Sequence, residues 1–325
     1  MDDDIPYLLL TPGPLTTSKT VKKAMLQDYC TWDDDYHFLV KGIRSQLVGL
    51  AGGNQSHTAV LMQGSGTFAV EATIGSVIPR NGKLLVPANG AYGKRIRDIA
   101  ARLNIPRRVI EQAETKPINP QDVESAIQQD PAITHVALVH CETTTGLMNP
   151  AAEVGEVCRR FGRTYILDAM SSFGGIPMSI EQLGAQYLIS SSNKCIQGVP
   201  GFGFVVADRE SLNETEGWAR SLSLDLFDQW RTMEAGGGKW RFTSPTHSVR
   251  AFAQALTELD EEGGVAARYK RYCRNQQTLV DGMESLGFRA LIKRKDQSPI
   301  ITAFLFPPDP RFRFTDFYEA IKRRR

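Results

Sequence analysis

The sequence predicts an α/β protein whose core is a mainly parallel sheet. Short strand-like runs alternate with amphipathic stretches along most of the chain, which is the pattern of βα units. Apolar residues make up 42% of the 325 residues and charged residues 23%, and mean hydropathy is -0.26; together these values exclude a mainly disordered chain, a fibrous repeat and a membrane protein. The length predicts either one large domain or two domains that share a core.

Strand-like runs and helices alternate in the larger, N-terminal part of the chain. The runs are short and apolar, and they are 59–62, 83–86, 135–140, 164–167, 187–190 and 203–207. Helical spacing of apolar residues predicts helices at 67–77, 92–103 and 150–161, the last ended by Gly162. We therefore expect these helices to flank the sheet that the runs form.

The last part of the chain has a different pattern. A long helical segment, 246–286, is interrupted by two glycines and is followed by a strand-like run, 300–306, and a helix, 314–322. No long linker or internal repeat separates this part from the rest, so the two should pack closely. The expected division is an N-terminal segment (1–16), a large domain (17–245) and a smaller α+β C-terminal domain (246–325).

Charge and cysteine content limit the partners and the compartment. The net charge is +2, from 38 Lys and Arg against 36 Asp and Glu, with the signs interspersed, so no global field favours nucleic acid or an anionic membrane. The five cysteines form no C-x-x-C pair and no secretory apolar stretch follows Met1, which favours the cytoplasm. The apolar runs are far shorter than the roughly 20 residues that span a bilayer. The histidines lack zinc-site spacing, so we expect no metal.

A glycine-containing turn, QGSGT at 63–67, follows a strand-like run and begins a helix. Glycines let the backbone approach an anion, the free N–H groups at a helix start point toward it, and the Ser65 and Thr67 hydroxyls add donors. The alternative is an ordinary βα turn with an N-cap. As a dinucleotide fingerprint the motif is only partial, because no acidic residue lies between Glu71 and Asp98 to hold a ribose; a Rossmann oxidoreductase is therefore the weakest interpretation.

Two chemically active side chains follow neighbouring strand-like runs. Asp168 comes directly after 164–167, and the carboxyl ends of strands in an open parallel sheet line the ligand crevice. Lys194 follows 187–190, and a buried lysine has a lowered pKa and can attack an aldehyde. Alone, each is more often a capping aspartate or a surface lysine. With an anion site they form the set that pyridoxal phosphate requires: a lysine for the aldehyde, a carboxylate for the ring nitrogen and a phosphate site.

Six short motifs occur in order along the chain: LTPGP (10–14), QGSGT (63–67), ANGAYG (88–93), HCETTTG (140–146), DAMSSFGG (168–175) and SNKC (192–195). Each alone is common. As an ordered set they resemble the class V group of fold-type I pyridoxal-phosphate-dependent aminotransferases, and the resemblance runs over essentially the whole chain. It implies a large domain with a seven-stranded, mainly parallel sheet flanked by helices, an N-terminal segment that packs at the active site, and a smaller α+β domain.

The resemblance also implies roles for individual residues. Lys194 would bind the cofactor covalently and act as the catalytic base, Asp168 would pair with the ring nitrogen, and Tyr92 would stack on the ring. The residues expected to contact the phosphate or other parts of the cofactor are Ser65, Gly66, Thr67, Thr143, Thr144, Asn193, Trp240 and Thr243. The residues expected at the substrate mouth are Thr11, Pro12, Gly13 and Arg241.

The activity that the resemblance implies is transfer of the amino group of 2-aminoethylphosphonate to pyruvate, with ping-pong kinetics, in phosphonate catabolism. Serine:pyruvate and alanine:glyoxylate aminotransferases share every cofactor motif and are the alternative; a non-catalytic protein that binds pyridoxal phosphate is the alternative of another class. A homodimer is implied, because in relatives a loop of the partner subunit, here 239–243, completes the phosphate site. The arginine that anchors substrate in relatives is expected beyond residue 325, so the C-terminal domain is expected to be incomplete.

Overall fold

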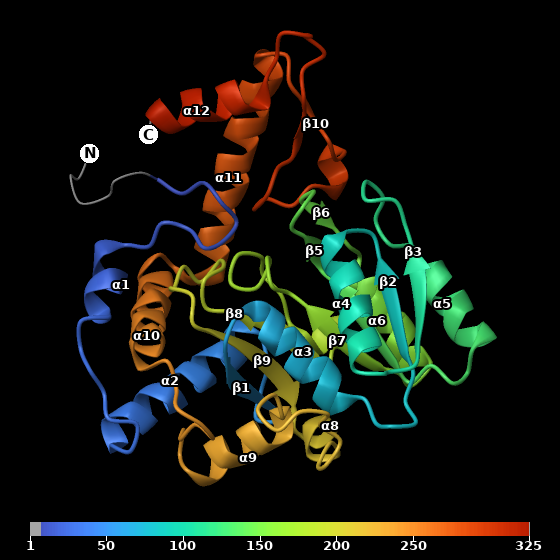
Figure 1. Ribbon diagram of the computed structural model, residues 1–325, viewed down its shortest axis with the longest axis vertical. Coiled ribbons are helices and arrows are strands. Elements are labelled where there is room, and N and C mark those ends of the chain that lie inside the picture. The colour runs from blue at the N-terminus through green and yellow to red at the C-terminus, as the bar shows by residue number, and fades with distance from the viewer. Residues whose placement is uncertain (1–7, 325) are drawn as a thin grey trace.

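The computed structural model describes residues 8–324 and contains a central seven-stranded sheet (Figure 1). Residues 1–7 of the expected N-terminal segment lie outside the described residues. The strand next to the first edge is antiparallel to both of its neighbours, and the other strands share one direction, so the predicted mainly parallel sheet is confirmed. In spatial order the strands are β1 (His57–Gln63), β9 (Phe202–Asp208), β8 (Tyr187–Ser191), β7 (Thr164–Asp168), β4 (His135–Val139), β2 (Leu84–Ala88) and β3 (Arg107–Glu111).

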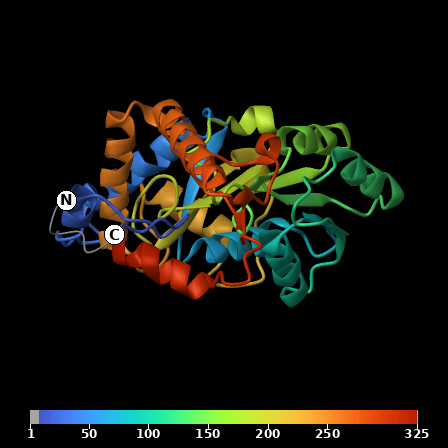
Figure 2. The same ribbon diagram turned by 90° about the horizontal axis from the view of Figure 1, so that it is seen from above.

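Helices cover both faces of the sheet, which lies between them when the molecule is seen from above (Figure 2). One face packs against α3 (Gly66–Val77) and α4 (Ala91–Arg102). The helices on the other face are α2 (Asp34–Leu50), α5 (Pro120–Gln129), α6 (Ala151–Arg160) and α10 (Thr246–Glu261). The remaining helices are α1 (Lys19–Ala24), α7 (Ile180–Leu183), α8 (Arg209–Asn213), α9 (Leu226–Ala235), α11 (Gly264–Ser285), α12 (Phe314–Arg324) and the 3-10 turn η1 (Arg294–Asp296).

Alternate residues of each central strand face the two helix layers. In β7, Tyr165 and Leu167 belong to one apolar cluster and Ile166 to the other, and all three are buried. Strand residues that point to either face must therefore be apolar, which explains why the central strands are continuous apolar runs in the sequence.

The sequence pattern does not predict β3. This strand lies at the edge of the sheet, pairs only with β2, and includes Arg107 and Arg108, with no residue fully buried. An edge strand can carry charged residues because one side of it meets water, so it lacks the continuous apolar run that reveals a central strand.

The C-terminal part begins with a helix that packs into the core of the sheet. Val249 and Phe252 of α10 lie in the same apolar cluster as Phe202 and Phe204 of β9, and the rings of Phe252 and Phe202 are 5.1 Å apart. The predicted break in the long helical segment is present, since α10 ends at Glu261 and α11 begins at Gly264. The division expected after residue 245 stays a prediction.

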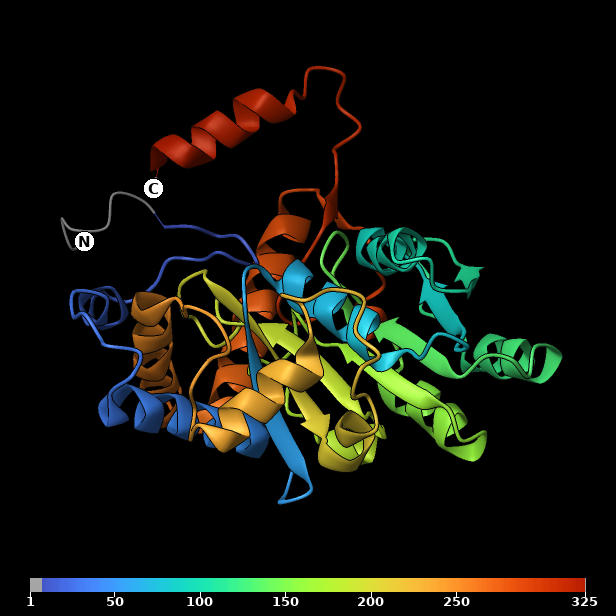
Figure 3. The same ribbon diagram turned by 60° about the horizontal axis from the view of Figure 1, so that its bottom comes forward.

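Beyond α11 the chain forms a two-stranded sheet of β10 (Arg289–Ala290) and β11 (Phe304–Leu305) and then α12. The strand-like run expected at 300–306 is regular only over β11, where the backbone pairs with β10. Helix α12 buries none of its side chains and lies apart from the sheet layers (Figure 3). Among residues 8–324, none of the helices combines the length and the apolar character that a bilayer span requires.

Candidate active site

The predicted catalytic residues meet at one edge of the sheet. Asp168 is the last residue of β7, and the turn that carries Lys194 follows the adjacent strand β8. The turn at 63–67 follows β1, which runs in the same direction, and leads into α3. Because parallel strands place their carboxyl ends at the same edge, the three motifs share one crevice.

Asp168 is a buried carboxylate, with only 3% of its surface exposed. Its Oδ1 accepts a hydrogen bond from the backbone N–H of Met170 at 2.9 Å. Burial raises the pKa of Asp168 to about 6, against the lowering effects of the Met170 N–H and of the Arg95 and Lys194 charges. Within residues 8–324, nothing donates a hydrogen bond to its second oxygen, which leaves an acceptor for a protonated ring nitrogen.

Lys194 is partly buried against the N-terminal segment. Its Nζ donates to the carbonyl oxygen of Gly13 at 3.3 Å. Burial lowers the pKa of Lys194, while the neighbouring charges of Cys195 and Asp168 raise it. A Cβ at Gly13 would lie 2.8 Å from Lys194 Cδ and 2.5 Å from the Asn193 oxygen, so this close approach requires glycine. The predicted mouth residue Gly13 is thus in contact with the catalytic lysine.

The turn that carries Lys194 is held from behind by α11. Arg268 is 2% exposed, and its Nη1 donates to the Cys195 carbonyl oxygen at 2.7 Å. The same guanidinium is paired with Glu262 at 2.8 Å, so its charge is compensated. Thr11 and Pro12 line a hollow between the N-terminal segment and α11, with Cys195 on its wall. Helix α11 therefore helps to position the turn that carries Lys194.

The glycine-containing turn has the geometry of an anion site. Ser65 is the N-cap residue of α3, but its side chain makes no capping hydrogen bond, so its hydroxyl is available to a ligand. A Cβ at Gly66 would lie 2.4 Å from Met170 Sδ, and Gly64 has a φ of +114° with Phe68 packed against it. The φ of Gly64 requires glycine, and a side chain at position 66 would displace Met170. Thr67 faces the cavity described next.

A small cavity is lined by Thr67 of this turn and by Asp168. Helices α3 and α4, which lie side by side (Figure 1), supply the rest of its wall together with Met170. The Arg95 guanidinium lies 4.6 Å from the centre of the Tyr92 ring, and its Nη1 donates to Thr67 Oγ1 at 3.3 Å. The cavity is lined by Thr67, Val70, Tyr92, Arg95, Ile96, Asp168 and Met170. The structure thus brings together three residues that the sequence predicts, Thr67, Tyr92 and Asp168, and adds Arg95.

Tyr92 is positioned by a buried carboxylate. Glu142, in β5 (Cys141–Glu142), accepts the backbone N–H of Tyr92 at 3.2 Å and of Gly93 at 2.9 Å, and so caps α4 from a distant part of the chain. Burial raises the pKa of Glu142, and these two N–H groups lower it. A Cβ at Gly90 would lie 2.5 Å from Glu142 Oε2, so glycine there makes room for the carboxylate.

Three other predicted contacts lie on the loops around the cavity. Thr143 hydrogen-bonds Ser171 with a distance of 2.6 Å between the hydroxyl oxygens, and Asn193 Oδ1 accepts from the Ser191 hydroxyl at 3.0 Å. Thr144 is exposed on the turn between β5 and β6 (Leu147–Met148). None of these three residues lines the cavity, so their expected contacts with the cofactor stay predictions.

The predicted residues of the loop 239–243 lie away from the cavity of their own chain. Trp240 packs edge-on against Phe202 at 6.1 Å within the core. Arg241 forms an ion pair with Asp228 at 3.1 Å and donates to the Leu222 carbonyl oxygen at 2.5 Å. Thr243 is exposed. Roles for Trp240, Arg241 and Thr243 at the active site remain predictions that depend on a partner subunit.

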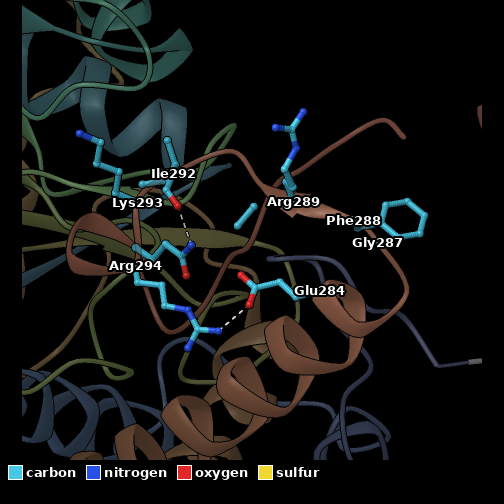
Figure 4. A pocket seen from close by; sticks show the side chains of 9 residues that line it. Glu284, Gly287, Phe288, Arg289, Ile292, Lys293 and Arg294 are labelled. Atoms are coloured by element: carbon cyan, nitrogen blue, oxygen red, sulfur yellow. Dashed lines mark hydrogen bonds and ion pairs between the residues drawn. The ribbon is translucent and has the colours of Figure 1, made fainter. Parts of the chain in front are cut away.

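A second hollow, in the C-terminal part, has no residue in common with this site (Figure 4). Arg294 on its wall is paired with Glu284 at 2.7 Å and with Asp281 at 2.9 Å, and Gln297 donates to the Ile292 carbonyl oxygen at 2.6 Å. Arg289 and Lys293 also line this hollow, and neither has an ion-pair partner among the described residues. Because the hollow shares no residue with the site that holds Asp168 and Lys194, we assign it no part in the chemistry.

Comparison with known proteins agrees with this geometry. The family model for aminotransferase class V matches residues 28–309. The chain belongs to the class V aminotransferases. It is 59% identical over 319 residues to a 2-aminoethylphosphonate–pyruvate transaminase of Syntrophobacter fumaroxidans, covering 98% of this chain and 86% of the relative. It is 60% identical over 318 residues to the transaminase of the same name from Vibrio cholerae, covering 98% and 87%.

The fold of this aminotransferase is also that of a solved structure. The aspartate aminotransferase of subgroup IV from Thermus thermophilus superimposes with a TM-score of 0.88 at 22% identity, covering 98% of this chain and 87% of that one. The predicted fold class, fold-type I with a seven-stranded sheet flanked by helices, is therefore confirmed.

The cofactor of this aminotransferase is pyridoxal 5'-phosphate, as predicted, and the residues of the site fit it. Asp168 offers a buried acceptor for the ring nitrogen, and Lys194 offers an amine whose pKa is lowered. Ser65 and Thr67 offer hydroxyls at the start of α3, where Gly66 exposes its backbone without a side chain. Each part of the cofactor thus has a chemically suitable partner.

Sequence reasoning missed Arg95, Glu142 and Arg268. Arg95 lies one helical turn after Tyr92, so its i+3 spacing within a motif helix is a signal that could have found it. Glu142 stands in the motif at 140–146, but nothing local reveals that it caps α4. Arg268 carries no local signal, because it contacts Cys195 only through the tertiary fold.

Proposed function

We propose that this enzyme transfers the amino group of 2-aminoethylphosphonate to pyruvate, producing phosphonoacetaldehyde and L-alanine in a step of phosphonate catabolism. The observation that carries the proposal is that Asp168 and Lys194 follow adjacent strands and lie at the same edge of the sheet. The chain is also 59% and 60% identical to transaminases named for this donor and acceptor. The pair of Asp168 and Lys194 is what transamination demands of a protein.

The residues of the site divide the chemistry between them. When bound, the cofactor supplies an aldehyde for the amine and a ring that takes up the electrons of the broken C–H bond. Lys194 Nζ, whose pKa burial lowers, takes the proton from the carbon that bears the amino group and later delivers one to the keto carbon of pyruvate. Asp168 keeps the ring nitrogen protonated. The two halves occur in turn, which gives ping-pong kinetics.

The remaining residues bind and orient. The Ser65 and Thr67 hydroxyls and the N–H groups that begin α3 at Gly66 bind the phosphate. Tyr92 packs on the ring, since its position is fixed by Glu142. The residues proposed to contact the rest of the cofactor are Thr143, Thr144 and Asn193. Gly13, with Thr11 and Pro12, forms the substrate side of the site against Lys194.

We infer that the enzyme is a homodimer in which the loop 239–243 of one subunit completes the site of the other. Trp32 and Phe242 are 72% and 50% exposed, and Lys239 lies over the Trp32 ring at 3.4 Å, which places apolar surface beside that loop. In the dimer, Thr243 adds a hydroxyl to the partner's phosphate site. All five cysteines are free, which supports the expected cytoplasmic location.

The visible absorption spectrum of the protein reconstituted with pyridoxal phosphate tests the proposed reaction. We expect a band from the Lys194-bound cofactor that disappears when 2-aminoethylphosphonate or alanine is added separately, but not when serine is added. Lys194→Ala should show no such band. Loss of the band with serine but not with 2-aminoethylphosphonate would favour the alternative, a serine:pyruvate or alanine:glyoxylate aminotransferase. A band that no amine removes would mean a protein that binds the cofactor without transamination.

A further inference from the structure

Arg95 is a cation at the mouth of the cofactor cavity with no role in the proposed function. It extends from α4 across the gap to α3, where its Nη1 donates to Thr67 Oγ1 at 3.3 Å. Its guanidinium lies 4.6 Å from the centre of the Tyr92 ring, and the same cavity is lined by Asp168. The side chain is thus directed by two contacts toward the end of the cavity at which α3 begins.

The charge of Arg95 is not neutralised by the protein. Its neighbours on α4 are paired: Lys94 with Glu114 at 2.9 Å, and Arg97 with Asp98 at 2.8 Å and Glu111 at 3.3 Å. Throughout the described part of the chain, by contrast, no carboxylate lies within ion-pair distance of Arg95. A guanidinium with one hydrogen bond to a hydroxyl and one aromatic contact keeps most of its five donors for a ligand.

The charge of Arg95 also affects the pKa values of Asp168 and Lys194. The pKa of Lys194 is lowered first by burial and in addition by the Arg95 charge. The pKa of Asp168 is raised first by burial, and the Arg95 charge acts against that rise. A cation that influences both catalytic groups lies close to the space the cofactor occupies between them.

The ligand that fits this cation is a phosphate group. The groups proposed to bind the cofactor phosphate, on Ser65, Gly66 and Thr67, are hydroxyls and backbone N–H groups without formal charge. A phosphate ester carries about two negative charges at neutral pH, and guanidinium is the side chain that binds it most strongly. We infer that Arg95 is a ligand of the cofactor phosphate and supplies its positive charge. The inference rests on the cofactor role proposed for the turn at 63–67.

Comparison of two aldehydes tests the inference, because pyridoxal has the ring and the aldehyde of pyridoxal phosphate but no phosphate. Cofactor-free wild-type protein and Arg95→Gln are titrated with each compound, and binding is followed by visible absorbance. We expect Arg95→Gln to weaken binding of pyridoxal phosphate by about tenfold or more and binding of pyridoxal by less than about twofold. Inorganic phosphate should compete with pyridoxal phosphate in the wild type and much less in Arg95→Gln.

Arg97→Gln is the matched control, since it removes a guanidinium from the same helix, and it should bind both compounds as the wild type does. Arg95→Lys, which keeps the charge, should recover part of the affinity. Equal weakening of both compounds by Arg95→Gln would overturn the inference, because Arg95 would then act through Tyr92 or the fold. Unchanged binding of pyridoxal phosphate would overturn it as well. Wild-type protein that binds pyridoxal phosphate but does not react with 2-aminoethylphosphonate would contradict only the proposed reaction.

Discussion

At the scale of the residue, burial of Asp168 couples stability to pH. The carboxyl has a pKa of about 6 in the folded protein against 3.8 when unperturbed, because burial disfavours its charged form. Between these values the folded state binds more protons than the unfolded state, so this group lowers the free energy of unfolding as pH rises from about 4 to about 6. The full effect, present above the folded pKa, is about 3 kcal/mol for the cofactor-free protein.

Asp168→Asn removes this titration while keeping the shape of the side chain. We expect the stability difference between Asp168→Asn and the wild type to grow by about 3 kcal/mol in favour of the variant from about pH 4 to about pH 7. Urea unfolding of both cofactor-free proteins at several pH values measures this difference, and titrating groups that do not interact with Asp168 cancel in the comparison. A difference that does not change with pH would contradict the burial argument. The variant should also lose transaminase activity.

Gly13 lies where the neighbouring atoms leave no room for a side chain. Its φ of +147° and the backbone oxygen of Asn193 leave no room for a Cβ. We expect Gly13→Ala to cost about 1–3 kcal/mol of stability and to slow covalent binding of the cofactor, because the new methyl group displaces Lys194. Gly42→Ala in α2 is the control: nothing lies within 4 Å of its Cβ, so the change should be neutral or stabilising. Stopped-flow absorbance and urea unfolding measure the two effects, and a Gly13→Ala protein that behaves like Gly42→Ala would refute the assignment.

The residues that could be predicted from sequence are those that follow strands. Asp168 ends one apolar strand and Lys194 lies on the turn that follows the next, and the topology of a parallel sheet then brings them to the same edge. Arg95 and Glu142 could not be found in this way. Each acts across a gap between elements, Arg95 from α4 to α3 and Glu142 from β5 to α4. The i+3 spacing places Arg95 on the same face of α4 as Tyr92, but the local sequence does not show which element lies opposite that face.

At the scale of the element, α10 belongs to the same apolar core as the strands of the sheet. Phe252 is fully buried, and its ring lies 5.1 Å from Phe202 and 5.9 Å from Phe204. We expect Phe252→Ala to lower the stability by about 3–5 kcal/mol, through lost burial and the cavity that remains. Phe314→Ala in α12, where the ring is 53% exposed, is the control and should change it by less than about 0.5 kcal/mol.

The same experiment examines the division expected after residue 245. If α10 and β9 share one cooperative core, thermal unfolding of Phe252→Ala should shift as a single transition. Two transitions, of which only the weaker moves, would mean that α10 unfolds with a separate C-terminal unit. Sequence periodicity predicted α10 and its break before α11 but could not predict this packing, because a helical pattern reveals an apolar face and not the surface that covers it. Edge strands are harder to predict from sequence than helices, as β3 shows.

At the scale of the whole molecule, the proposed homodimer makes each active site depend on a second copy of the chain. The loop 239–243 does not reach the cavity of its own chain, and Thr243 on it is exposed. In the proposed homodimer, the partner subunit supplies the Thr243 hydroxyl, and the active site is then a property of the dimer. Substitutions of Lys194 on one subunit and of Thr243 on the other then fall in the same site of a mixed dimer and leave the second site intact, and this can be measured.

We expect Lys194→Ala to be inactive and Thr243→Ala to bind pyridoxal phosphate weakly, each when purified alone. In a mixed dimer, one site carries both substitutions and the other carries neither, because Thr243 acts on the opposite subunit. Co-expression of the two variants in equal amounts should therefore restore about a quarter of the wild-type activity, since half of the dimers are mixed and each has one intact site of two. If Thr243 instead acted within its own chain, no site in the mixture would be intact, and the activity would not exceed that of the parent variants. Recovery of activity thus requires that the loop 239–243 of one subunit reaches the site of the other. If no activity is recovered, each site consists of residues of one chain only.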